Sequence, residues 1–147
     1  MKRMGTLLTL IFLSLICQAP EQRTLLAERI EPIRPYENVW KAVCMVESSG
    51  NPLAYHMEKN GHASIGIAQI QESRIKDFNK RTGKNYKLAD MYDPAKSKDV
   101  FLHYATGIGY RNPERICRLW NGGEPNGMKI KETYRYWLKV QKVYLSL

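Results

Sequence analysis

The stretch VCMVESSGNP, residues 43–52, places a single glutamate at the end of an apolar helical run, directly before two serines, a glycine, an asparagine and a proline. The spacing of apolar residues predicts a helix from about residue 37 to residue 48. Three side chains on this helix precede Glu47 by one or two turns: Trp40, Val43 and Cys44. Glu47 therefore shares their apolar face.

The position of Glu47 predicts a carboxyl group that stays protonated near neutral pH. Apolar surroundings disfavour the charged form, and so does the negative end of the helix macrodipole at the C-terminus. A protonated carboxyl group is what a general acid needs to protonate a leaving group. Taken alone, a solvent-facing glutamate is the simpler interpretation, so the residues that follow Glu47 decide between the two.

Length and composition predict one globular domain behind an export signal. The chain has 147 residues, 44% of them hydrophobic, which suits a single core. Residues 1–3 carry two positive charges, and residues 6–17 form an uncharged, mostly apolar run too short to span a bilayer comfortably. We expect a signal peptide over residues 1–19 and one domain over residues 20–147.

The end of the signal region leaves the form of the exported protein open. Pro20 directly after Ala19 disfavours cleavage at that point, so the cleavage site is uncertain. Cys17 allows an acylated lipoprotein, and an uncleaved signal allows a membrane-anchored form. In each case we expect a location in the periplasm or the cell envelope.

The charge of the chain favours polyanionic partners. There are 23 Lys and Arg against 14 Asp and Glu, and loss of Lys2 and Arg3 with the signal leaves a net charge of +7. Because the signal points out of the cytoplasm, cell-wall polymers and anionic lipid are expected rather than nucleic acid. An ordinary solvated face of Lys and Arg is the alternative.

The chain reads as predominantly helical, an all-α fold. Asp93-Pro94 and Asn112-Pro113 each place a capping side chain before a proline, so two helices are expected to begin there. Residues 131–147, KETYRYWLKVQKVYLSL, have the spacing of one helical face. The turn dipeptide Asn60-Gly61 allows at most one short β-hairpin, near residues 55–65.

Four segments resemble the motifs of one enzyme family, the lytic transglycosylases of the soluble-lytic-transglycosylase (SLT) type. Residues 47–54, ESSGNPLA, resemble the ESxxNPxA signature, and residues 66–70, GIAQI, are similar to GLMQI. Residues 120–123, WNGG, resemble YNxG, and residues 132–140, ETYRYWLKV, resemble ETxxYxxKV. Each motif is weak by itself, but the four occur in the family's order over about residues 36–144.

The resemblance implies a lysozyme-like domain that cleaves the β-1,4 bond between N-acetylmuramic acid and N-acetylglucosamine. In this family the ESxxNPxA glutamate, here Glu47, protonates the glycosidic oxygen. It then acts as a base while the muramoyl 6-hydroxyl attacks C1, and the product is a 1,6-anhydro sugar. This chemistry needs no second carboxylate, whereas ordinary glycosidases use a pair. The nearest candidates for such a partner lack distinguishing context, apart from the helix cap Asp93: Asp77, Asp90, Asp93 and Asp99.

The resemblance also implies a set of substrate-binding residues: Ser48, Ser49, Gln69, Trp120, Asn121 and Tyr136. Ser48 and Ser49 would steady the site, and Gln69 would hydrogen-bond sugar hydroxyls or amides. Asn121 would support the cleft wall, and Tyr136 would approach the sugar that carries the developing positive charge.

Three features depart from the family pattern. Trp120 replaces the usual tyrosine, and an indole donates a hydrogen bond but does not accept one as a phenol does. Ala68 replaces the usual methionine. The segment between Ala54 and Gly66 is a few residues longer, which would reshape the lip of the cleft.

No cofactor or metal is expected, because the histidines lack the close spacing of a zinc site: His56, His62 and His103. Cys44 lies one turn before Glu47, and Cys117 lies just before the WNGG segment. If both segments line one cleft, the two sulfurs lie close together, either in a disulfide or as packed thiols.

Three classes of function follow. The leading one is a peptidoglycan lytic transglycosylase, with peptidoglycan glycan strands as substrate and envelope secretion or conjugation machinery as candidate partners. A hydrolytic lysozyme on the same fold is the second. A noncatalytic glycan-binding assembly factor is the third, and the intact motif around Glu47 argues against it.

Overall fold

The helix predicted around Glu47 is present as α3 (Arg34–Ser48). The computed structural model describes residues 34–59 and 61–147, so the expectations for the signal region lie outside the described residues. Trp40, Val43 and Cys44 are all buried, as their shared face predicts. Glu47 is the last residue but one of α3 and is partly buried.

Four further helices follow, and two of them, which begin at Pro94 and Pro113, start where the capping signals predicted. They are α4 (Glu72–Thr82), α5 (Pro94–Ile108), α6 (Pro113–Gly122) and α7 (Lys131–Tyr144). The Asp93 side chain accepts a hydrogen bond from the Ala95 amide, and the Asn112 side chain accepts one from the Arg115 amide. Two short 3₁₀ helices, η1 (Leu88–Tyr92) and η2 (Gly127–Lys129), precede α5 and α7.

A small antiparallel sheet confirms the predicted hairpin and adds a strand that the sequence did not indicate. Its strands β1 (Tyr55–Met57), β2 (Ala63–Ile65) and β3 (Ile70–Gln71) lie in the order β1-β2-β3. Strand β3 has two residues, too few to show an alternating pattern. It pairs with β2 because Gly66 and Gln69, both with positive φ, reverse the chain between the two strands.

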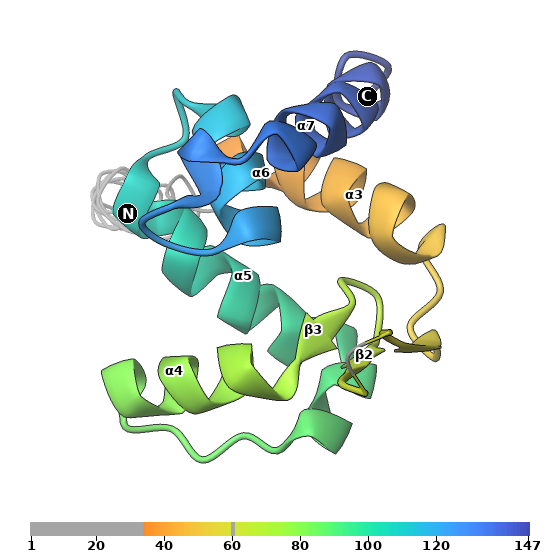
Figure 1. Cartoon of the computed structure of the whole chain (residues 1–147), viewed down its shortest axis with the longest axis vertical. Helices are drawn as coiled ribbons and strands as arrows, with labels where there is room; N and C mark the ends of the chain where they lie inside the picture. The colour runs from red at the N-terminus through yellow and green to blue at the C-terminus, as the bar shows by residue number, and fades with distance from the viewer. Residues whose placement is uncertain (1–33, 60) are drawn as a thin grey trace, which may run out of the picture. The chain divides into compact units, whose positions relative to one another are not determined.

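Residues 35–147 form one compact unit, and its elements lie in two halves (Figure 1). Helices α3, α6 and α7 lie in one half, α4 and the sheet lie in the other, and α5 runs between them (Figure 1). Phe101 of α5 is fully buried, and its ring lies 5.2 Å from the rings of both Trp40 and Trp120, measured between centroids. The fold is thus the predicted, mainly helical one. None of the helices in the described part of the chain is long and apolar enough to cross a membrane.

Gly66 is a point where β2 and η1 approach too closely for any other residue. Its φ is +77°, and a Cβ at this position would lie 1.9 Å from the Met91 carbonyl oxygen. That oxygen also accepts a hydrogen bond of 2.7 Å from the buried Ser97 hydroxyl. The contact therefore fixes the loop that leads into β3.

We expect Gly66→Ala to destabilise the fold by about 3 kcal/mol or more, because the methyl group adds a backbone clash to an unfavourable φ. Gly83→Ala is a matched control, since Gly83 has a similar φ of +73° but open space around its Cα, and it should cost about 1 kcal/mol. Urea unfolding of the two variants measures the difference. Equal losses of stability in the two variants would show that the Met91 carbonyl group moves aside without a loss of free energy.

Candidate active site

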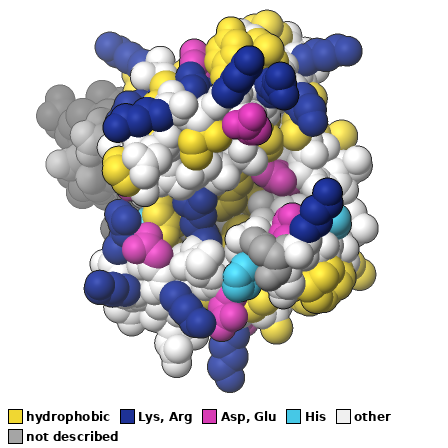
Figure 2. All heavy atoms as spheres, viewed as in Figure 1, with side chains coloured by type: hydrophobic (Ala, Val, Ile, Leu, Met, Phe, Trp, Pro, Cys, Tyr) yellow, Lys and Arg dark blue, Asp and Glu magenta, His cyan; other side chains and the backbone are white. Residues whose placement is uncertain are grey.

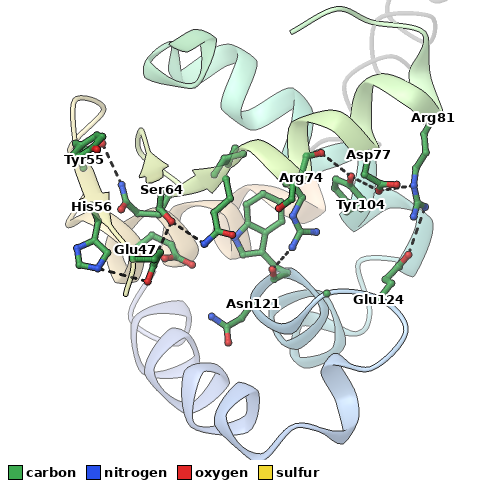
Figure 3. Close-up of a pocket in the computed structure, with 18 residues that line it drawn as sticks. Glu47, Tyr55, His56, Ser64, Arg74, Asp77, Arg81, Tyr104, Asn121 and Glu124 are labelled. Atoms are coloured by element: carbon green, nitrogen blue, oxygen red, sulfur yellow. Dashed lines mark hydrogen bonds and ion pairs between the residues drawn. The ribbon is translucent and has the colours of Figure 1, made fainter. Parts of the chain in front are cut away.

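A cleft of about 770 Å³ contains Glu47. Figure 2 shows this face of the molecule hollowed between the two halves, and Figure 3 shows the residues that line the hollow. The lining comes from the end of α3, from the sheet, from one face of α4, from Tyr104 of α5 and from the end of α6. Segments distant in the sequence therefore meet at one groove.

Glu47 has the electrostatic surroundings of an acid at neutral pH. Its pKa is raised to about 7, mainly by burial and to a smaller extent by the charge of Glu58. A hydrogen bond from Tyr136 and the charge of Arg74 oppose these effects. The Tyr136 hydroxyl donates to Glu47 Oε1 over 2.7 Å. The sequence predicted the direction of this shift, although the helix dipole is not among its principal causes.

Three residues of the predicted binding set lie outside the lining of the cleft. Tyr136 is 9% exposed, and its phenol contacts Glu47. Ser48 donates to the Ile67 carbonyl oxygen over 2.8 Å, which ties the end of α3 to the loop before β3. Ser49 is exposed and takes a φ of +55° at the turn after α3. Their places indicate positioning of Glu47 more than contact with a ligand.

The other three predicted residues line the cleft, each in a different way. Gln69 donates its amide to the Gly66 carbonyl oxygen over 2.9 Å, and so it also holds the loop. Trp120 is 6% exposed and presents little of its surface. Asn121 is exposed, and its side chain is labelled in Figure 3. Among the three predicted residues that line the cleft, Asn121 is therefore the exposed hydrogen-bonding group.

Glu58 is a second carboxylate in the lining of the cleft, and it was not predicted from the sequence. Ser64 donates to Glu58 Oε1 over 3.0 Å, and Gln71 donates to the Ser64 hydroxyl over 3.2 Å. His56 Nε2 lies 3.8 Å from Glu58 Oε2. Glu58 belongs to the longer segment between Ala54 and Gly66, and the predicted hairpin in that segment does not by itself show that Glu58 faces the cleft of Glu47.

The four aspartates weighed as a second acid have other partners. Asp93 caps α5, Asp90 pairs with Lys96 over 2.6 Å, and Asp99 pairs with Lys84. Asp77 does line the cleft, where its carboxylate accepts a hydrogen bond of 2.8 Å from Tyr104.

Arginine side chains from α4 occupy the floor and one end of the cleft. The Arg74 guanidinium lies 4.8 Å from the centre of the Tyr104 ring and 4.7 Å from that of Trp120, and burial lowers its pKa. Arg81 pairs with Asp77 over 2.8 Å. The helical spacing of positions 74, 77 and 81 could have placed them on one face, but nothing in the sequence shows what that face contacts.

Cys44 and Cys117 are free, buried thiols, so the disulfide considered from the sequence is not formed. Both belong to the same core cluster. Burial raises the pKa of Cys44 to about 12, with a smaller effect from the charge of Glu47, and the same two causes raise the pKa of Cys117. Both thiols are therefore protonated and packed in the hydrophobic core.

Within residues 34–59 and 61–147, no group of three or more His, Cys, Asp and Glu side chains could hold a metal ion. The side chains that line the cleft offer carboxyl, amide, hydroxyl, imidazole and guanidinium groups.

Comparison with known proteins points to one family. A family model described as "Transglycosylase SLT domain" matches residues 32–106, which hold the segments around Glu47 and Gln69 but end before those of Asn121 and Tyr136. A lysozyme from Magallana gigas is 31% identical over 106 residues, covering 69% of this chain and 75% of that protein. No solved structure gives a significant match.

The pKa of Glu47 predicts how stability depends on pH. Because this pKa rises from 4.5 to about 7 on folding, the stability that Glu47 contributes is complete below about pH 4.5 and is lost as the pH rises through 7. The glutamine in Glu47→Gln does not titrate. The free energy of unfolding of this variant minus that of the wild type should therefore be greater at about pH 8 than at about pH 4, by roughly 3 kcal/mol. Urea unfolding across this range measures the change, and parallel profiles would contradict a desolvated carboxyl group.

Proposed function

The chain belongs to the transglycosylase SLT domain family, and we propose that it cuts peptidoglycan glycan strands by transglycosylation at Glu47. At the level of the family it is a lysozyme-like, glycan-cleaving enzyme that acts on peptidoglycan. The finer proposal is cleavage of the bond between N-acetylmuramic acid and N-acetylglucosamine with formation of a 1,6-anhydro end.

The observation that carries this proposal is a carboxyl group with a pKa of about 7 in the wall of a cleft of about 770 Å³. At neutral pH such a group is divided between its acid and base forms, and the proposed reaction uses both in turn. Tyr136 donates to Oε1 of Glu47, so Oε2 is the atom that carries the transferable proton. The same hydrogen bond stabilises the carboxylate once that proton has left.

In the first step Glu47 gives its proton to the glycosidic oxygen, and the bond from this oxygen to C1 of the muramoyl residue breaks. The electron pair of that bond stays with the leaving oxygen, and positive charge develops at C1. In the second step the Glu47 carboxylate takes the proton of the muramoyl 6-hydroxyl, while the oxygen of that hydroxyl forms a bond to C1. Glu47 regains its starting state, and water is neither consumed nor released.

In this proposal the remaining residues either bind the glycan or position Glu47. Gln69, Trp120 and Asn121 lie along the path of the glycan, with Asn121 the exposed donor and acceptor. Ser48 keeps the end of α3 against the Ile67 loop, and Ser49 forms the turn that follows. A loss of either serine would therefore displace Glu47 rather than remove a ligand contact.

Hydrolysis is the second candidate, and Glu58 is the observation that favours it. A second carboxylate in the same cleft, held by Ser64, suits a general base that takes a proton from water as the water attacks C1. The two reactions differ in their products, since transglycosylation leaves anhydro ends and hydrolysis leaves reducing ends.

The proposed setting is the periplasm or the cell envelope, where an enzyme for peptidoglycan meets its substrate. An envelope secretion or conjugation machine would supply local placement. A noncatalytic glycan-binding role would instead give binding to purified sacculi without release of soluble muropeptides.

We expect Glu47→Gln to reduce muropeptide release at least about 100-fold, because both proton transfers are lost while the shape of the side chain is kept. Binding to sacculi should persist, since an amide still hydrogen-bonds in the cleft. Glu72→Gln removes an exposed carboxylate of α4 and serves as the control. Release by a folded Glu47→Gln protein at the wild-type rate would exclude Glu47 as the acid.

Mass spectrometry of the product ends, in wild type and in Glu58→Gln, separates the two candidate reactions. For transglycosylation we expect anhydro ends, with a loss of less than about tenfold in Glu58→Gln, because Glu58 transfers no proton. For hydrolysis the ends are reducing, and loss of the general base should cost about 100-fold or more. Reducing ends from the wild-type protein would overturn the transglycosylation proposal.

A further inference from the structure

Two arginines of α4 reach across the cleft to the opposite half of the molecule. The Arg74 guanidinium donates to the Trp120 carbonyl oxygen at the end of α6 over 2.6 Å. Seven residues further along α4, Arg81 lies 3.7 Å from a carboxylate oxygen of Glu124, in the segment after α6. Figure 3 shows the second contact at the end of the cleft away from Glu47.

The side chain of Arg81 is directed toward the opposite wall by residues of its own half and of α5. Its Nε atom pairs with Asp77 over 2.8 Å, one turn earlier on α4. Tyr104 donates to the same carboxylate over 2.8 Å, and the Arg81 guanidinium lies 5.6 Å from the centre of the Tyr104 ring. Asp77 and Tyr104 thus hold the guanidinium in place before it meets Glu124.

The Arg81–Glu124 pair lies where a glycan that leaves Glu47 along the cleft would have to pass. Arg81, Gly123 and Glu124 all line this end of the groove. A polymer bound through its interior needs both ends of its groove open, whereas a groove closed at one end receives a chain terminus. A bridge between the walls is therefore a barrier to continuous strands.

We propose that this ion pair closes one end of the cleft and forms a terminal subsite for the last sugars of a glycan strand. The proposal rests on the glycan-cleaving function above and adds the site of attack on the strand. The enzyme cuts near strand ends in preference to the interior, and it releases short fragments while most of the polymer stays long.

The strength of the preference follows from the exposure of the pair. The side chains of Arg81 and Glu124 are 46% and 40% exposed, so water screens their attraction. Exposed ion pairs favour the closed arrangement only modestly, equivalent to about a fivefold population ratio at most. An internal segment of a strand can displace the pair, and the preference is therefore partial.

The test compares long, soluble glycan strands cut by wild type, by Glu124→Gln and by Glu72→Gln. Glu72 pairs with Lys76 over 3.0 Å on the outer surface of α4, so its substitution matches the change in charge without touching the cleft. At equal numbers of bonds cut, the ratio of internal to terminal cuts is measured from the fall in mean strand length and the yield of short fragments.

We expect this ratio to rise two- to fivefold in Glu124→Gln, because removal of the pair opens the end of the cleft. Arg81→Gln should give a change in the same direction, and Glu72→Gln should match wild type. An unchanged ratio in Glu124→Gln, or an equal rise in Glu72→Gln, overturns the proposal. Absence of any bond cleavage by wild type contradicts the glycan-cleaving function instead, so the two failures are distinguishable.

Discussion

The hydrogen bond from Tyr136 to Glu47 joins residues 89 positions apart, and the site depends on it. It requires α7 to pack its inner face against the core, where Thr133 and Val140 are fully buried. Burial is the main cause that raises the pKa of Glu47, whereas the hydrogen bond from the Tyr136 phenol lowers this pKa and fixes one carboxylate oxygen. The balance between these effects leaves an acid that titrates near neutral pH.

Trp120, which replaces the family's usual tyrosine, contacts both halves of the domain. The indole lies between Phe101 and the Arg74 guanidinium, 4.7 Å from the latter. The backbone carbonyl oxygen of Trp120 accepts a hydrogen bond from the same arginine. Trp120 therefore connects the two halves at the floor of the cleft, and Arg81 repeats the connection through Glu124 at its end. Both contacts join α4 to the end of α6 and the segment after it.

Local signals predicted much of the fold correctly. Proline after Asp93 and after Asn112 marked two helix starts, because the capping side chain and the fixed φ act within one turn. The third strand was not predicted, since its two residues pair only when the loop from Gly66 to Gln69 reverses the chain. The acid Glu58 was not predicted either, because the spacing along the chain does not show that a hairpin residue and Glu47 line the same cleft.

The sequence by itself determined the helices α3, α5, α6 and α7, the apolar face that carries Glu47 and the family to which the chain belongs, because periodicity, caps and motifs depend on residues close together in the chain. Only the tertiary structure decided which side chains meet. It brought Tyr136 to Glu47, left Cys44 and Cys117 as free thiols, and placed Arg81 opposite Glu124. These contacts depend on how the helices pack around one core, and no spacing along the chain encodes a distance between two helices.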